Sequence, residues 1–213
     1  MRAASPHPSA PDCRRTALIT AAISEFAANG YRAASTNRIV EAARVSKGLL
    51  FHYFCDKKGL YIETVRTCIT ELIRRFDERL GPTSNDVFER LRQYTLTKWS
   101  LIEEQPLTFA FLQEALTDPP AELRDALLAS TAEITASTYQ RLFQDIDTSA
   151  FRPGVTVERA MLLLSWTFDG LGKQYATILK QQPLDLANVQ SLIFAEVDTY
   201  VALLRHGIET DPS

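Results

Sequence analysis

The side chains best suited to chemistry in this 213-residue chain lie between positions 36 and 57. Hydroxyl groups, cations and aromatic rings are interleaved there, and side chains of these kinds bind phosphate oxygens and base edges. Catalysis is a poorer interpretation, because the chain has only three histidines and no HExxH pair, glycine-rich phosphate loop or Ser/His/Asp set. We therefore expect a polyanion-binding segment with no catalytic residue, metal site or cofactor. An all-helical enzyme fused to such a segment is the competing class.

Two short helices joined by a tight turn are predicted to position these side chains. The hydroxyls of Thr36 and Ser46 can each cap a helix start by accepting a hydrogen bond from a free backbone N–H. The inward apolar positions are Ile39, Val40, Ala43, Val45, Leu50 and Phe54, and the outward ones are Lys47, Gly48, Leu49, Phe51, His52 and Tyr53. An exposed Phe-His-Tyr cluster beside lysines is costly to leave in water. A slim helix with an early glycine can enter the roughly 12 Å major groove of DNA, so the segment predicts a helix-turn-helix.

Helical periodicity continues along the rest of the chain, without an alternating strand pattern. An apolar stripe over 19–27 stops at Asn29-Gly30, and Asp56 is placed to cap a long helix that ends before Gly81-Pro82. Further helices are expected at about 85–105, 106–117, 121–147, 156–180 and 185–206. The prediction is an all-α fold of about nine helices. It comprises a disordered arm (1–11), an N-terminal three-helix helix-turn-helix domain (12–60) and a larger helical domain (61–208).

Charge is divided unevenly along the chain. Residues 1–60 carry nine Lys or Arg and four Asp or Glu, a net +5, whereas residues 61–213 carry 14 and 22, a net −8. A basic head on an acidic body indicates that only the head meets a polyanion. The three scattered cysteines suit a reducing compartment, and neither a secretory signal nor a run of eighteen apolar residues is found. We expect a cytoplasmic protein with no membrane partner.

The last two expected helices are apolar on more than one face. Their main stripes run over 157–178 and 186–204, and Leu162, Leu163 and Trp166 are among the apolar residues on other faces. Such helices need two neighbours, one of which can belong to another chain. We predict a homodimer through a four-helix bundle made by these two helices of each subunit, with packing inside a single chain as the alternative.

The segment from Thr36 to Leu60 closely resembles the DNA-binding domain of the tetracycline-repressor (TetR) family of one-component regulators. The matching residues are Thr36, Ile39, Ala43, Val45, Ser46, Lys47, Gly48, Leu50, Phe51, His52, Tyr53, Phe54, Lys57 and Leu60. The resemblance implies a DNA-binding transcriptional regulator, above all a repressor, whose partner is double-stranded operator DNA. It also implies a DNA-binding set of Thr36, Arg44, Ser46, Lys47, Gly48, Leu49, Phe51, His52, Tyr53 and Lys57.

Each of these residues has an implied role. Lys47 would read guanine O6 and N7, Gly48 would allow close approach, and Leu49 and Phe51 would touch thymine methyl groups. Phosphates would be bound by Thr36, His52, Tyr53 and Lys57. A solvated surface lysine and a partly buried structural histidine are the plainer alternatives for Lys47 and His52.

Arg44 departs from the family pattern, since it occupies the turn position where the family often has Gly. Either the turn differs, or Arg44 takes a left-handed backbone conformation at a cost of about 1 kcal/mol. The guanidinium could also add a phosphate contact.

The resemblance further implies an effector-binding and dimerisation domain at 61–208. In this family a bound small molecule tilts the fourth helix and changes the separation of the two recognition helices of the dimer. The candidate residues for an unknown effector are Trp99, Phe109, Phe111, Gln113, Glu114, Tyr139, Trp166, Phe168, Asp169 and Tyr175, although core packing explains most of their spacing equally well. The acids Glu114 and Asp169 would suit a cationic ligand. A TetR-like regulator without a ligand, and an activator, remain the alternatives.

Overall fold

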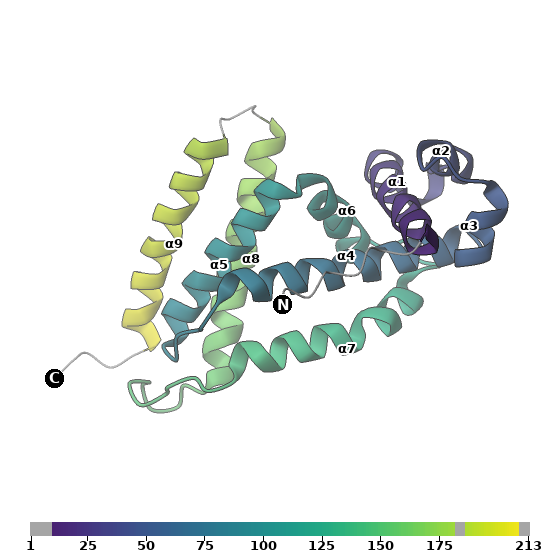
Figure 1. Ribbon diagram of the computed structural model, residues 1–213. Coiled ribbons are helices and arrows are strands. Elements are labelled where there is room, and N and C mark those ends of the chain that lie inside the picture. Colours follow the sequence, from purple (N-terminus) through teal and green to yellow (C-terminus); the bar gives the residue numbers. More distant parts are fainter. Residues whose placement is uncertain (1–9, 182–185, 209–213) are drawn as a thin grey trace, which may run out of the picture. The chain divides into compact units, whose positions relative to one another are not determined.

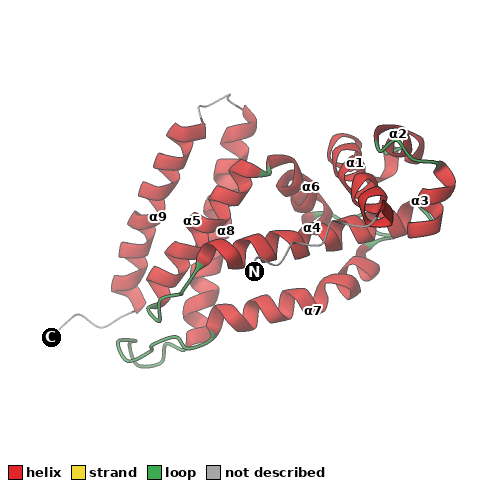
Figure 2. Ribbon diagram, in the orientation of Figure 1, coloured by secondary structure: helices red, strands yellow, loops and turns green. Residues whose placement is uncertain are grey.

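A computed structural model describes residues 10–181 and 186–208 of the chain, and this part contains nine helices and no strand (Figure 1; Figure 2). The helices are α1 (Ala10–Ala33), α2 (Thr36–Ala42), α3 (Lys47–Phe54), α4 (Lys57–Leu80), α5 (Val87–Glu104), α6 (Pro106–Thr117), α7 (Arg124–Phe143), α8 (Val157–Gln181) and α9 (Leu186–Ile208). The predicted all-α fold is confirmed. The predicted disordered arm lies almost wholly outside the described residues, which begin at Ala10.

The helix boundaries lie where the sequence places its stop and start signals. Gly30 interrupts α1 with φ 64° and ψ 175°, a left-handed conformation that glycine adopts without strain. Asp56 caps α4 as predicted, because its Oδ1 accepts a hydrogen bond from the Gly59 N–H at 2.7 Å. Gly81, with φ 63°, follows the last residue of α4. These signals depend on neighbouring residues only, which is why they are readable from the sequence.

The described residues form two compact units. The first unit comprises residues 10–73 and 105–135, and the second comprises 74–104, 136–181 and 186–208. The units therefore do not coincide with the segments 12–60 and 61–208, since α6 packs on α1 inside the first unit. One continuous core fills the first unit, and its fully buried side chains include Leu18, Phe26, Ile39, Leu50, Leu60, Val65, Phe111 and Leu123.

In the second unit α5, α8 and α9 pack on one another around Phe88, Met161, Leu164 and Ile208. Asp86 organises the start of α5: its Oδ1 accepts from the N–H groups of Phe88 and Glu89 at 2.9 and 2.8 Å. The same carboxylate accepts two hydrogen bonds from the guanidinium of Arg205 in the last turn of α9, each 2.9 Å long. One carboxylate thus caps α5 and ties its start to the end of α9.

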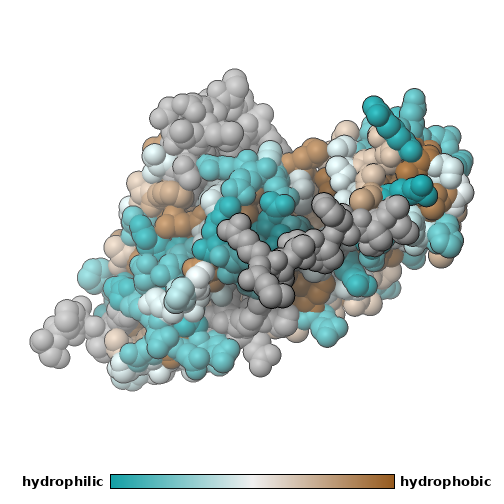
Figure 3. Space-filling model, viewed as in Figure 1, coloured by the Kyte–Doolittle hydropathy of each residue, from teal (hydrophilic) through white to brown (hydrophobic). Residues whose placement is uncertain are grey.

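No helix in the described ranges is long and apolar enough to cross a membrane. On the face of the molecule seen in Figure 3, hydrophilic and apolar residues are mixed over α1–α3.

Candidate nucleic-acid interface

The turn between α2 and α3 is a Schellman motif built around Arg44. The N–H of Val45 donates to the carbonyl of Val40 at 3.0 Å, and the N–H of Arg44 donates to the carbonyl of Glu41 at 3.1 Å. Val40 and Val45, the apolar pair that accompanies this motif, both pack against the core of the first unit. Arg44 has φ 54°, so the left-handed alternative anticipated for this residue is the one adopted, and its side chain is exposed.

The caps predicted for α2 and α3 have different outcomes. Ser46 caps α3 as predicted, with its Oγ accepting from the Leu49 N–H at 3.3 Å. The predicted cap by Thr36 is wrong, because α2 begins at Thr36 itself and Ser35 takes the capping position without a side-chain bond. The Ser35 N–H instead donates to Glu25 Oε1 at 2.8 Å. A carboxylate from α1 therefore satisfies a backbone group at the start of α2.

Helix α3 has a buried face and a solvent face, as predicted. Leu50 and Phe54 are fully buried, whereas Lys47, Gly48 and His52 are exposed and Phe51 is 40% exposed. Leu49 and Tyr53 were predicted to face outward but are half-buried, because Tyr53 packs against the core of the first unit, with its ring 5.5 Å from that of His52. A Cβ added at Gly48 would meet nothing within 4 Å. The solvent face of α3 therefore presents a cation, aromatic rings and a bare backbone position side by side.

A tight turn connects α3 to α4. Cys55 has φ 64° and ψ −50°, and the N–H of Asp56 donates to the carbonyl of Phe54 at 2.7 Å, which makes a strained γ-turn. A Cβ added at Gly59 would lie only 2.1 Å from the Phe54 carbonyl oxygen. Only glycine therefore fits at position 59, a requirement that we did not predict from the sequence.

Two ion pairs hold the helices around α3. The Arg15 guanidinium on α1 pairs with Glu63 on α4 and lies 5.8 Å from the centroid of the Phe54 ring. The Arg38 Nε donates to Glu25 at 2.9 Å, and the same guanidinium donates to the Ala33 carbonyl at 3.1 Å. The hydrogen bond from Arg38 holds the pKa of Glu25 below its ordinary value.

Lys57, which was expected to bind phosphate, is half-buried and contacts its own chain. Its Nζ donates to the carbonyl of Arg32 at 3.0 Å and lies 5.0 Å from the centroid of the Tyr31 ring. Burial lowers the pKa of this ammonium below its ordinary value.

Only some of the cations of the basic N-terminal segment are available to bind a polyanion. Within the described residues up to Leu60, the exposed cations that form no ion pair with an acid and no hydrogen bond to a carbonyl are Arg14, Arg44 and Lys47. Arg14, on the second turn of α1, is absent from the predicted DNA-binding set. The net charge of the head was the only sequence signal that pointed to it, since Arg14 is one of nine cations there.

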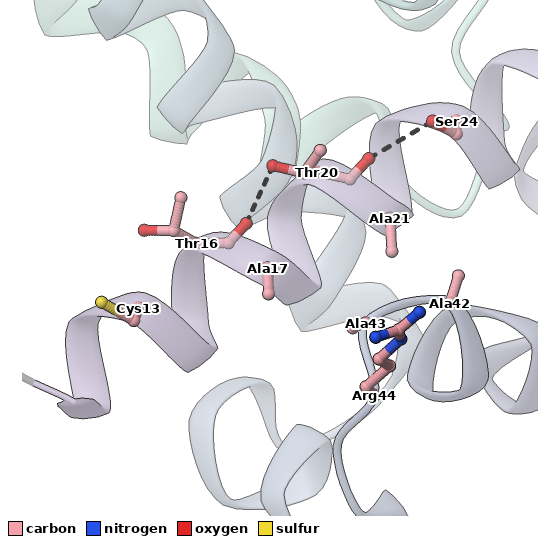
Figure 4. Close-up of a pocket in the computed structure, with 9 residues that line it drawn as sticks. All are labelled: Cys13, Thr16, Ala17, Thr20, Ala21, Ser24, Ala42, Ala43 and Arg44. Atoms are coloured by element: carbon pink, nitrogen blue, oxygen red, sulfur yellow. Dashed lines mark hydrogen bonds between the residues drawn. The ribbon is translucent and has the colours of Figure 1, made fainter.

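A shallow open groove runs between α1 and the α2–α3 turn (Figure 4). Its lining residues are Cys13, Thr16, Ala17, Thr20, Ala21, Ser24, Ala42, Ala43 and Arg44. The Thr20 and Ser24 hydroxyls donate hydrogen bonds to backbone carbonyls of α1 at 3.0 and 3.5 Å, so both hydroxyl protons already have an acceptor within the helix. Figure 4 shows the Arg44 side chain at the edge of this groove, opposite the α1 residues.

Comparison with known proteins identifies the family. Residues 18–64 match the family described as bacterial regulatory proteins, tetR family, and residues 85–209 match the tetracyclin repressor-like C-terminal domain. The chain belongs to the TetR family. Members of this family are transcriptional regulators, so the helix-turn-helix of this TetR-family protein is a DNA-binding element and the protein regulates transcription.

Three similar proteins illustrate the relationship. The HTH-type transcriptional repressor KstR2 of Rhodococcus jostii RHA1 is 25% identical over 182 residues, which are 78% of this chain and 89% of that protein. The HTH-type transcriptional activator FasR of Mycolicibacterium smegmatis is 27% identical over 143 residues, 66% of this chain and 64% of that protein. The crystal structure of FadR from Bacillus subtilis in complex with stearoyl-CoA superimposes with a TM-score of 0.62 and 21% identity, covering 85% of this chain and 96% of FadR.

The described effector candidates of this TetR-family chain are distributed over both units. Phe111 is buried in the first unit, with its ring 6.0 Å from that of Phe26 and 5.4 Å from that of Tyr61. On the same helix, Phe109 packs against that core, whereas Gln113 and Glu114 are exposed.

In the second unit Trp99 is half-buried beside Leu171 and Val197, and Trp166 is 68% exposed. The side chains of Tyr139, Phe168, Asp169 and Tyr175 lie outside the described residues. Phe111 is thus a core residue of the helix-turn-helix unit, and of the two second-unit candidates whose side chains are described, Trp99 is the more buried.

Proposed function

We propose that this regulator is a repressor that binds a palindromic operator as a homodimer and leaves it when a small molecule binds within residues 61–208. The solvent face of α3 is the observation that carries the proposal. Lys47, Gly48 and Phe51 project away from a core held by Leu50 and Phe54, so the groups that can read DNA are separated from those that hold the helix. Phe51 in particular leaves apolar surface in water that a thymine methyl group would cover.

The proposed DNA contacts divide into base reading and phosphate binding. Lys47 donates to guanine O6 and N7, Gly48 lets the backbone approach the base edges, and Leu49 and Phe51 contact thymine methyl groups. Phosphates are bound by Thr36, Ser46, His52 and Tyr53, and also by Arg44 and Arg14. Arg44 and Arg14 suit phosphate binding because both are exposed and form no ion pair within the described residues. Phosphate contacts set the register of α3, and the base contacts select the sequence.

The proposed dimer uses α8 and α9. Large apolar side chains remain exposed on both helices of the single chain, namely Leu162, Leu163, Trp166, Leu192 and Leu203. Leu162, Leu163 and Trp166 share one side of α8, and a second copy would cover them. A two-fold dimer places two copies of α3 on half-sites about 34–36 Å apart, which requires a palindromic operator.

Sedimentation equilibrium tests this interface. Trp166→Ser is expected to give a monomer at micromolar concentration. The control is Leu116→Ser, which removes a half-exposed leucine from α6 and is expected to leave the dimer intact. A wild-type protein that sediments as a monomer would refute the dimer.

An effector is proposed by analogy with the relatives. FadR, which shares the fold, was crystallised with stearoyl-CoA, and KstR2 is a repressor. The ligand acts by binding the DNA-incompetent state more tightly than the DNA-bound state. Trp99 is the proposed contact within residues 61–208, since it lies half-buried against an apolar cluster. Stearoyl-CoA is the first probe, followed by a metabolite and drug screen read by thermal shift.

The relationship to FasR supports a second candidate, an activator with the same DNA-binding surface. A promoter–reporter assay with and without the gene distinguishes the two: loss of a repressor raises expression, whereas loss of an activator lowers it.

Binding to DNA is tested with duplexes selected from a random-sequence pool by the purified wild-type protein. Fluorescence anisotropy on the selected duplex is expected to show affinity that falls with salt, and Lys47→Met is expected to weaken binding and relax the base preference. A wild-type protein that selects no duplex and shows no salt-sensitive binding would refute the proposed function.

A further inference from the structure

Lys57 stands at the first residue of α4, three residues after the recognition helix α3 ends. A lysine at such a place would ordinarily be assigned to a DNA phosphate, since a helix N-terminus also attracts anions. In this chain, however, the Nζ of Lys57 donates to the Arg32 carbonyl at 3.0 Å. The ammonium therefore points to the last turn of α1.

The ring of Tyr31 provides the second contact of the ammonium, with its centroid 5.0 Å from the Lys57 Nζ. Tyr61, one turn further along α4, holds the same ring at 5.1 Å between centroids in an edge-on arrangement. Tyr61 is 2% exposed, and burial raises the pKa of its hydroxyl to about 12. Lys57 and Tyr61 thus hold one aromatic side chain of α1 between them, in an environment from which water is partly excluded.

The start of α4 already has an anion of its own. The Asp56 carboxylate accepts the Gly59 N–H at 2.7 Å, so it occupies the position where a phosphate would meet the free N–H groups of the helix. A DNA phosphate there would be repelled by this carboxylate. Arg44 and Lys47, by contrast, are exposed and have no ion pair in the described part of the chain.

From these contacts we propose that Lys57 is a positioning residue: it fastens the start of α4 to the end of α1 and makes no phosphate contact. The inference rests on the proposed DNA-binding function. Helix α3 lies between the two elements that Lys57 joins, since α2 and α3 follow α1 and α4 follows α3. Loss of the fastening lets α3 shift against α1, so the bases are read less well even though the number of neutralised phosphates stays the same.

The test compares three methionine variants by anisotropy, on the selected duplex and on a random-sequence duplex, between 50 and 300 mM KCl. The logarithm of affinity falls with the logarithm of salt by about 0.9 for each neutralised phosphate, or about 1.8 for a symmetric pair. Lys57→Met is expected to keep the wild-type slope and to reduce the ratio of selected to random affinity about tenfold. Lys57→Arg, which can still donate to the carbonyl and stack on Tyr31, is expected to restore that ratio.

Two matched variants calibrate the measurement. Arg44→Met removes a proposed phosphate contact and is expected to lower the slope by about 1.8 per dimer. Lys58→Met alters the neighbouring exposed lysine, whose Nζ donates to the Glu122 carbonyl at 3.3 Å, and is expected to leave the affinity ratio unchanged. A slope for Lys57→Met that falls like that of Arg44→Met would overturn the proposal, and so would an unchanged slope together with an unchanged ratio.

A second measurement uses wild-type protein and needs no folded variant. The side-chain ¹⁵Nζ resonance of Lys57 is expected to keep its position when the selected duplex is added, while that of Lys47 moves. A ¹⁵N–³¹P coupling at Lys57 in the complex would overturn the assignment. If wild-type protein binds no duplex, the proposed function itself fails, and this is observed before any variant is compared.

Discussion

Substituting Ala for Gly59 should destabilise the protein through a clash with its own backbone. The new Cβ would lie 2.1 Å from the Phe54 carbonyl oxygen and 3.2 Å from the carbonyl carbon. Ordinary contact requires a movement of about 1 Å, and a neighbouring backbone group has no rotamer by which it can give way. Leu60, the next residue, is completely buried, so α4 cannot simply slide outward.

The magnitude follows from three contributions. Overpacking against the Phe54 backbone costs about 2–3 kcal/mol, and displacement of the Gly59 N–H from Asp56 removes a cap worth about 1 kcal/mol. Alanine recovers about 1 kcal/mol through its higher helix propensity. The free energy of unfolding should therefore fall by about 2–3 kcal/mol.

Gly48→Ala is the matched control, because it places the same methyl group in a helix where nothing lies within 4 Å. This variant should be more stable than wild type by about 1 kcal/mol. It should nevertheless bind the selected duplex about tenfold more weakly, since the methyl group stands where the α3 backbone approaches the base edges.

Urea titration followed by far-UV circular dichroism measures both stabilities, and anisotropy measures binding. The two variants should differ by about 3–4 kcal/mol in the free energy of unfolding, in opposite directions from wild type. A Gly59→Ala protein as stable as wild type would refute the clash argument. A Gly48→Ala protein with undiminished affinity would refute the assignment of α3 to the major groove.

Three further predictions concern other described contacts. Arg44→Gly should be about 1 kcal/mol more stable than Arg44→Ala in urea, because φ is 54° at this position and glycine alone adopts it without strain. Both variants should lower the salt dependence of DNA affinity equally. Equal stabilities would contradict the proposed strain at Arg44. Glu25→Gln should destabilise the protein by about 1–2 kcal/mol at pH 7, because the hydrogen bond from Arg38 lowers the pKa of Glu25 in the folded state. Since the pKa of Glu25 is lower in the folded state than in the unfolded state, this stabilisation is present above about pH 4.5 and is lost as the pH falls through the folded pKa. The stabilities of wild type and Glu25→Gln should therefore converge in acid. Stability curves that stay parallel down to pH 3 would contradict this prediction. Burial opposes the ionisation of Asp86, but the hydrogen bonds and charge of Arg205, together with the backbone N–H groups of Glu89 and Phe88, outweigh it and hold its pKa below the ordinary value. Asp86→Asn keeps the capping oxygen and should lose only the carboxylate charge and the Arg205 bond to Oδ2. Asp86→Ala should lose the cap as well and be about 1 kcal/mol less stable than the Asn variant by urea titration; equal stabilities would show that the cap contributes nothing.

Much of the fold could be predicted because its signals are local. Capping by Ser46 and Asp56, the break at Gly30 and the apolar spacing of Leu50 and Phe54 each depend on residues within about one helical turn. The failed cap at Thr36 shows where this reasoning stops. The choice between Ser35 and Thr36 as the capping residue involves a carboxylate ten residues earlier, on another helix.

The amino-acid sequence by itself determined that the chain is helical, that a basic head precedes an acidic body, and which face of α3 is available to DNA. Apolar periodicity, helix start and stop residues, and charge are properties of neighbouring residues, so they can be recognised without a structure. Tertiary structure alone decided that Arg44 takes a left-handed turn, that position 59 admits only glycine, and that the ammonium of Lys57 binds α1. A lysine carries the same charge wherever it stands, and its partner is set by segments that the fold brings together from 25 residues away.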